Sequence, residues 1–227
     1  MKTTLPRNRE KALTVFLLCA AAYAIFFCFS GCGKKESGKN ESQKLPDDIY
    51  SLEVLKSRKK KDLFLLSDPK SPLKATDREN FKGLPYYPPT YDFIFSCVLQ
   101  HHPASKEISI QTSKNKPRTM LNIGYVSFNF HQQTYRLQVY VPKDTTEDGM
   151  YYFIPFTDRT NGTETYHGGR FLDFDTMKND SLFLDFNYAY NPYCAYNEKY
   201  DCPIPPAENH LQIPIYAGEK LFRKDSY

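Results

Sequence analysis

The 227-residue chain has no tryptophan and only ten glycines, against 16 prolines, 18 tyrosines and 17 phenylalanines. It has no glycine-rich phosphate loop, no HExxH motif and no Gly-x-Ser-x-Gly motif, so the usual signatures of nucleotide binding, zinc proteolysis and α/β-hydrolase chemistry are missing. No internal repeat and no nucleic-acid-binding motif is recognisable. Many prolines with few glycines indicate stiff loops and interrupted strands around an aromatic core, rather than long helices.

The chain has little net charge once its first residues are set aside. The formal charge is +4, from 30 basic and 26 acidic side chains. Four of the basic residues and one of the acids belong to the first 31 residues (Lys2, Arg7, Arg9, Lys11 and Glu10). The remainder therefore carries 26 basic and 25 acidic side chains, a balance of +1. The basicity belongs to a leader segment, and we expect no nucleic-acid partner.

One long apolar run follows the positive residues, from Ala12 to Phe29, and it stops at Ser30-Gly31-Cys32. Small residues just before a cysteine are the pattern that a lipoprotein signal peptidase cleaves. The thiol then receives diacylglycerol, and a further acyl chain such as palmitate makes the anchoring durable. We therefore expect residues 1–31 to be a lipoprotein signal peptide, and Cys32 to bind membrane lipid in the cell envelope. Gly33 is compatible with sorting to an outer membrane.

Two other interpretations of this segment stay open. The apolar run is long enough to span a bilayer uncut, and Phe29 stands where leucine is commonest. An uncleaved anchor and a plainly secreted form also place the rest of the chain outside the cytoplasm. Up to residue 46 the sequence is polar and without periodicity, so residues 32–46 are predicted to form a disordered tether of roughly 20 Å.

Residues 47–227 are predicted to form a single mainly β domain, an antiparallel barrel or sandwich with one N-terminal helix over residues 47–66. Asp47 and Asp48 can cap this helix. Ile49, Leu52 and Leu55 share one of its faces. The middle of the helix is basic, which indicates either attraction to anionic lipid headgroups or a solvated face. The basic residues are Lys56, Arg58, Lys59, Lys60 and Lys61.

Apolar residues then alternate with polar ones at the period of a strand, for example at Phe93, Phe95, Cys97 and Leu99. The alternation changes phase near Gly124, which predicts a β-bulge there. Turns are predicted at His131-Gln132, Asp148-Gly149 and Asn161-Gly162. Strands at short intervals with no helix between them favour an antiparallel arrangement.

Polar side chains gather in the C-terminal half. Over residues 182–191 one face is apolar and the other carries Asp185, Asn187 and Asn191. This row is compatible with a polar pocket, a solvent face or buried hydrogen bonds that hold loops. Around two preceding turns lie Asp158, Glu164, His167 and Arg170. They suit either ligand binding and acid–base chemistry or a buried ion-pair network.

Cys194 and Cys202 flank a loop stiffened by prolines. In an oxidising envelope a disulfide is the default, and on the chain-entropy model it would stabilise the fold by about 2.5 kcal/mol. Two unpaired thiols, or a metal or nucleophilic site, are the alternatives, although the spacing is not that of a zinc knuckle.

Three segments resemble the bacterial and archaeal family called domain of unknown function 1684. They are FIPFTDRTNGTETYHGGRFLD (153–173), LDFNYAYNPYCAYN (184–197) and CPIPPAENHLQIPIYAGEK (202–220). The resemblance implies no activity, but it extends the candidate set to Tyr166, Glu208 and Asn209. The chain departs from the family pattern at His167 and His210, which argues against a catalytic histidine.

The best hypothesis from the sequence is an envelope lipoprotein that binds a small ligand in a polar pocket. Tyr166 and Tyr190 would be its walls, and Arg170 would hold an anionic group. The pocket candidates are Asp158, Glu164, Tyr166, Arg170, Asp185, Asn187, Asn191, Glu208 and Asn209. The alternatives are a hydrolase that uses carboxylates, with a divalent metal as its only candidate cofactor, and a structural or interaction module with no site. The predicted partners are membrane lipid, through Cys32, and an unidentified small molecule.

Overall fold

The computed structural model of this protein describes residues 47–143, 151–175 and 177–222, with the side chains of Asp47 and Asp48 excepted. The predicted signal peptide, Cys32, the tether, the Asp47–Asp48 cap and the Asp148-Gly149 turn lie outside the described residues or side chains. In the part that is described, no helix is long and apolar enough to cross a membrane.

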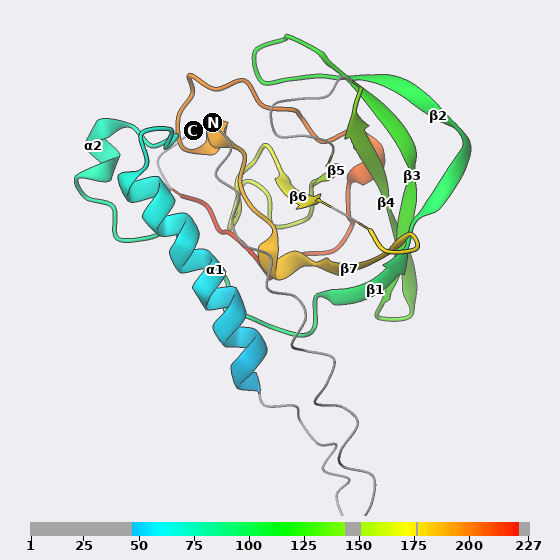
Figure 1. The fold of residues 1–227 in the computed structure, drawn as a ribbon, viewed down its shortest axis with the longest axis horizontal. Helices are drawn as coiled ribbons and strands as arrows, with labels where there is room; N and C mark the ends of the chain where they lie inside the picture. Colours follow the sequence, from blue (N-terminus) through cyan, green and yellow to red (C-terminus); the bar gives the residue numbers. More distant parts are fainter. Residues whose placement is uncertain (1–46, 144–150, 176, 223–227) are drawn as a thin grey trace, which may run out of the picture. The chain divides into compact units, whose positions relative to one another are not determined.

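Two antiparallel sheets dominate the domain (Figure 1). One has five strands in the order β2-β3-β4-β5-β6, and the other pairs β1 with β7. The elements are α1 (Asp47–Ser67), α2 (Ala75–Arg78), β1 (Ile94–Val98), β2 (Gln100–Ile110), β3 (Arg118–Phe130), β4 (Gln133–Pro142), β5 (Tyr152–Phe156), β6 (Arg170–Phe174), β7 (Ser181–Asp185) and the short 3-10 helices η1 (Phe186–Tyr188), η2 (Tyr193–Ala195) and η3 (Ala207–Asn209). The prediction of a mainly β antiparallel fold with an N-terminal helix is confirmed.

Of the two predicted architectures, the structure has the sandwich. Within the described residues, β2 and β6 remain the two edges of the large sheet, and β1 and β7 pair only with each other. The barrel alternative is therefore wrong. The barrel was predicted because the strands follow one another at short intervals. An open sheet that faces a second, smaller sheet has the same short intervals, so this spacing does not distinguish the two architectures.

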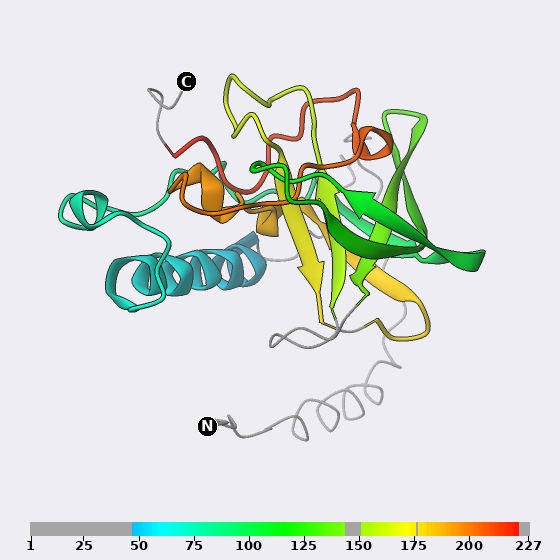
Figure 2. The same ribbon diagram turned by 90° about the horizontal axis from the view of Figure 1, so that it is seen from above.

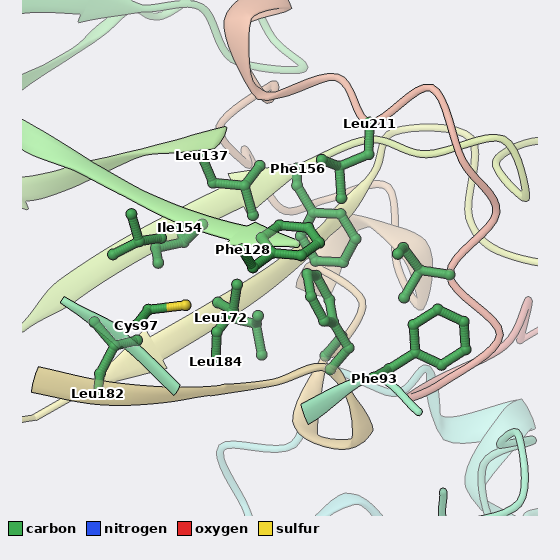
Figure 3. Packing of buried hydrophobic residues seen from close by; sticks show 14 of the residues in the cluster. Phe93, Cys97, Phe128, Leu137, Ile154, Phe156, Leu172, Leu182, Leu184 and Leu211 are labelled. Atoms are coloured by element: carbon green, nitrogen blue, oxygen red, sulfur yellow. The ribbon is translucent and has the colours of Figure 1, made fainter. Parts of the chain in front are cut away.

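The main core lies between the two sheets (Figure 3). Cys97, Leu182 and Leu184 from β1 and β7 face Phe128, Leu137, Ile154 and Leu172 of the large sheet in one cluster of buried side chains. These positions are the apolar half of each alternating pattern, so the period of two in the sequence specifies which face of each strand is covered.

The phase change at Gly124 is a bulge, as predicted. The register between β3 and β4 shifts between Asn122 and Gly124. A Cβ atom at Gly124 would lie 2.2 Å from the carbonyl oxygen of Gln100 on the neighbouring strand, so only glycine allows this approach. The predicted turn after β3 is also confirmed, since His131 and Gln132 have φ of 47° and 63° between β3 and β4.

The strand predicted over residues 182–191 ends early. Leu182, Leu184 and Phe186 are buried as the alternation requires, but β7 stops at Asp185. The Asp185 carboxylate accepts a hydrogen bond from the backbone N–H of Asn187 at 2.9 Å, which caps η1 and turns the chain out of the sheet. The residues after Asp185 therefore leave the predicted alternation, and Asn187 is buried while Tyr188 is exposed.

Helix α1 lies at the edge of the described domain in both views (Figures 1 and 2). It faces the domain with Val54, Arg58 and Leu65, all of which are buried. Arg58 donates hydrogen bonds to the carbonyl oxygens of Tyr87 at 2.8 Å and Asn187 at 3.3 Å. The basic residues in the middle of the helix therefore have two kinds of surroundings. Arg58 is buried against the domain, whereas Lys56, Lys59 and Lys60 are exposed.

Candidate functional site

Asp158 and Arg170 form a buried ion pair that organises the C-terminal segment. Arg170 Nη2 lies 2.8 Å from Asp158 Oδ2, and both side chains are at most 1% exposed. Arg170 also donates to the carbonyl oxygens of Ile215, Ala217 and Glu219. The Asp158 carboxylate in turn accepts from the N–H of Ile215 at 3.2 Å. Arg170 consequently has no surface left with which to contact a ligand.

Asn209 and Asn191 also bind backbone in the interior. The Asn209 amide bridges β4 and β5, since it donates to the carbonyl oxygens of Gln138 at 3.0 Å and Pro155 at 2.7 Å. Its oxygen accepts from the N–H of Gln138 at 2.7 Å. Asn191 donates through its side chain to the carbonyl oxygen of Lys220 at 2.8 Å. Both asparagines are almost fully buried and hold segments that are distant in the sequence together.

Three other candidates lie nearer the surface, and each has a different partner. Glu164 accepts from the hydroxyl of Tyr87 at 3.1 Å and lies 3.4 Å from Lys220 Nζ. Glu208 accepts from the hydroxyl of Tyr140 at 3.2 Å. Tyr166 donates to Cys194 Sγ at 3.6 Å. The structure therefore does not gather the nine candidates around one cavity.

One candidate acid does line a cleft, which lies between the sheet edges β6 and β7. The cleft has a volume of about 340 Å³. Its lining residues are Leu172, Asp173, Phe174, Phe183, Asp185, Tyr188 and Tyr190. The segment after η1 is fixed against β6, because Phe171 and Tyr190 exchange two backbone hydrogen bonds, of 2.9 Å and 3.0 Å. We call this the aromatic cleft.

The charged groups of the aromatic cleft are two carboxylates, and each accepts a hydrogen bond from a tyrosine hydroxyl. Asp185 Oδ2 accepts from the hydroxyl of Tyr50 on α1 at 2.7 Å, and its other oxygen accepts from the side chain of Asn187 at 2.8 Å. Asp173 Oδ2 accepts from the hydroxyl of Tyr190. The ring of Tyr190 also packs against Lys61, whose Nζ lies 4.9 Å from the ring centroid. Lys61 itself pairs with the buried Glu219 at 2.5 Å.

These surroundings change the acid strengths of the groups in the cleft. Asp173 is exposed as a whole residue, but its carboxylate lies among the rings of the cleft, and this burial raises its pKa to about 6. The hydrogen bond from Tyr190 acts in the opposite direction and lowers the pKa. Burial, together with the neighbouring carboxylate, raises the pKa of both Tyr50 and Tyr190. The two tyrosines therefore stay protonated as donors, while Asp173 changes its charge close to neutral pH.

Two further hollows, one larger and one of similar size, lie elsewhere on the domain. One of about 420 Å³ lies between α1 and residues 84–89, and one of about 340 Å³ lies beside α2 and Phe222. Neither is lined by any of the predicted site residues. In the described ranges, no group of three or more His, Cys, Asp or Glu side chains is placed to hold a metal ion.

Cys194 and Cys202 lie together as unbonded thiols. The backbone N–H of Cys194 donates to Cys202 Sγ at 3.2 Å. A hydrogen bond from the Cys202 thiol, with a second from the hydroxyl of Tyr166, lowers the pKa of Cys194 to about 7. The predicted disulfide stays a prediction, and the proximity of the sulfur atoms suits both a dithiol and its oxidised form.

Alkylation tests whether the thiol of Cys194 is deprotonated near neutral pH. We expect iodoacetamide to modify Cys194 with a rate that rises through an apparent pKa of about 7, faster at neutral pH than at Cys97, because burial raises the pKa of Cys97 to about 11. Peptide mass spectrometry with and without prior reduction gives the rate at each cysteine. Equal rates at Cys194 and Cys97 would contradict the assignment, and modification of Cys194 only after reduction would reveal the disulfide.

Comparison with known proteins agrees with the fold. A family model described as "Protein of unknown function (DUF1684)" matches residues 79–220. The chain belongs to this family. No curated protein matches it. A solution NMR structure of the uncharacterized protein from gene locus rrnAC0354 of Haloarcula marismortui is similar, with 28% sequence identity and a TM-score of 0.59. The match covers 78% of this chain and 96% of that one.

Sequence reasoning alone missed two groups of this DUF1684 chain's cleft. Asp173 had a usable signal, because it lies between Leu172 and Phe174 on an alternating strand and so points away from the core, as Asp185 does. Tyr50 had none. It reaches Asp185 from α1, which is 135 residues away in the chain.

Proposed function

We propose that this DUF1684 protein is a lipid-anchored protein of the cell envelope that binds a small cationic molecule in the aromatic cleft. The observation that carries the binding proposal is a pair of carboxylates, Asp173 and Asp185, among aromatic rings, with no basic side chain among the described residues that line the cleft. Carboxylates neutralise a positive charge, and aromatic faces attract an organic cation and cover its apolar part.

The two acids are suited to this role because their positions are set before a ligand arrives. Each accepts a hydrogen bond from a tyrosine hydroxyl, and the backbone N–H of Asn187 fixes Asp185 further. A preorganised site spends less of its interaction free energy on ordering side chains. The exposed rings of Phe183 and Tyr188 are at the same time accessible to a ligand.

The anchoring part of the proposal rests on the sequence up to Cys32. We expect the chain to fractionate with membranes and its mature N-terminal peptide to carry acyl groups on Cys32, as measured by mass spectrometry. The variant Cys32→Ser should lose the acyl mass. Detection of an unmodified Cys32 in a chain that is cleaved and released would contradict the anchor and leave the binding proposal standing.

Binding should depend on pH through Asp173. Its pKa is raised to about 6, so the carboxylate is charged above that pH and neutral below it. A bound cation favours the charged form. We therefore expect the affinity for choline or spermidine, measured by calorimetry on the full chain in detergent, to fall by about tenfold in total as pH is lowered through 6.

Substitution separates this site from general electrostatic attraction. Asp173→Asn should weaken binding about tenfold at pH 7.5, equivalent to about 1.4 kcal/mol, and remove the pH dependence near 6. Asp175→Asn is the matched control, since Asp175 is an exposed acid two residues away that does not line the cleft. The charge of Asp175 helps to raise the pKa of Asp173, so this variant should keep the pH dependence but move its midpoint to lower pH. Equal losses in the two variants, or no binding of either cation by the wild type, would contradict the proposal.

A hydrolase is the second candidate, and the raised pKa of Asp173 is the observation that favours it. A carboxylate with a pKa of about 6 is suited to act as a general base near neutral pH. Turnover of a choline ester that disappears in Asp173→Asn and persists in Asp175→Asn would favour the enzyme. Binding of choline without turnover of its esters would favour the binding protein.

A further inference from the structure

Helix α1 has an outward stripe of large apolar residues that the domain does not cover. Ile49, Leu52, Leu63 and Leu66 are between 43% and 64% exposed. Lys56 and Lys59 lie between them, and the spacing of the six positions is three or four residues throughout, so all project from one side of the helix. We call these six residues the outer face of α1.

The fold does not need this face, because α1 is attached to the domain through the opposite one. There Val54 and Leu65 are fully buried, the Arg58 guanidinium packs on the ring of Tyr86 at 4.4 Å, and Lys61 pairs with Glu219. An arginine is thus buried beside Val54 and Leu65, whereas five large aliphatic side chains of the helix, Leu55 and the four of the outer face, are exposed. Such an apolar stripe on a soluble domain marks an interaction surface.

We propose that the outer face of α1 lies on the anionic surface of the membrane that anchors the chain. The inference rests on the proposed anchoring and adds an orientation of the domain to it. The apolar run of the leader ends at Phe29 and the candidate lipid site is Cys32, only 17 residues before Ile49. The tether that the sequence predicts has, at that length, a typical end-to-end distance of roughly 20 Å, so we expect α1 to stay near the headgroups.

The composition of the face suits lipid. Aliphatic side chains enter the boundary between headgroups and acyl chains, whereas lysine lays its methylene stem along apolar surface and keeps its ammonium in the headgroup layer. Among the described side chains of the helix, three exposed lysines, Lys56, Lys59 and Lys60, outnumber the one exposed acid, Glu53. Each basic residue near an anionic surface contributes about 1 kcal/mol of attraction.

A second copy of the chain fits the same face poorly. The spacing resembles that of a coiled-coil seam, but Lys56 and Lys59 occupy its middle positions. They would meet their counterparts in both parallel and antiparallel pairs, which places like charges at the centre of the interface. Membrane docking also requires less affinity, since the anchor already supplies a high effective concentration of lipid.

The absence of tryptophan makes a direct test possible. The full chain with Leu52→Trp carries a single indole on the outer face, and the matched control Ile204→Trp carries one at an exposed apolar position next to β2. Each is purified in detergent and reconstituted in phosphatidylcholine vesicles with or without phosphatidylglycerol. Thermal melting followed by circular dichroism verifies that the fold is retained, as expected for exposed positions.

We expect the emission of Leu52→Trp to shift to the blue and to become protected from an aqueous quencher when phosphatidylglycerol is present, while Ile204→Trp does neither. Adding Lys56→Gln and Lys59→Gln to Leu52→Trp should remove the dependence on anionic lipid.

An unchanged Leu52→Trp emission in a chain that floats with the vesicles would overturn the docking and leave the anchor intact. A shift that grows with protein concentration whatever the lipid would assign the face to a second copy and also overturn the docking. A chain that does not float with vesicles would overturn both the anchor and the docking that rests on it.

Discussion

Replacing Arg170 with methionine is expected to lower the free energy of unfolding by about 3–5 kcal/mol, because it leaves the Asp158 carboxylate buried without its counter-ion. Arg170 is fully buried and donates to Asp158 and to three carbonyl groups between Ile215 and Glu219. Methionine restores most of the volume but none of these bonds. Chemical denaturation of the full chain, followed by circular dichroism, measures the change.

Two further variants test whether the buried charge is the cause. Asp158→Asn combined with Arg170→Met removes the charge as well as its partner, so this double variant should be more stable than Arg170→Met alone. Glu164→Gln disrupts the partly exposed pair with Lys220 and should cost less than about 1 kcal/mol. A similar loss in Arg170→Met and Glu164→Gln would show that burial of the ion pair contributes little.

This ion pair illustrates why the residues predicted to line one pocket do not lie together in the structure. The sequence predicts Asp158 and Arg170 around turns and Asn191 on the polar face of residues 182–191, where solvent or ligand contact is a reasonable expectation, and the family resemblance adds Asn209. Their partners include backbone groups that no local pattern identifies: Arg170 donates to carbonyl groups 45 to 49 residues further along the chain, and Asp158 accepts from the N–H of Ile215. The alternatives that the sequence left open, a buried ion-pair network for Asp158 and Arg170 and buried hydrogen bonds that hold loops for Asn191, describe what the structure has. Asn209 is buried in the same way.

More of the fold than of the site could be predicted from the sequence, because the alternation of apolar and polar residues is a local property. The strand containing Phe95 and Cys97 and the bulge at Gly124 both follow from the order of apolar residues within ten positions or so. Alternation failed after Asp185, where a side chain competes for the backbone: the Asp185 carboxylate caps η1 and ends β7. That same event turns Tyr188 outward, so the irregularity that defeats the pattern also forms part of the aromatic cleft.

The second large effect is expected at Phe186, where Phe186→Ala should reduce stability by about 3–5 kcal/mol. Phe186 is fully buried between the two sheets, and its ring centroid lies 5.2 Å from that of Phe156, 5.7 Å from Phe128 and 6.2 Å from Phe95. Its removal leaves a cavity that the surrounding rings, each fixed on a different strand, cannot collapse to fill. Denaturation of the full chain again measures the loss.

Phe183→Ala is the matched comparison, three residues earlier on the other face of β7. Phe183 is 71% exposed, so its loss should change stability by no more than about 0.5 kcal/mol. It lines the aromatic cleft, however, so cation binding should weaken in Phe183→Ala although the fold is retained. Comparable destabilisation by the two substitutions would contradict the assignment of inner and outer faces to β7. Unchanged cation affinity in Phe183→Ala would remove this ring from the proposed site.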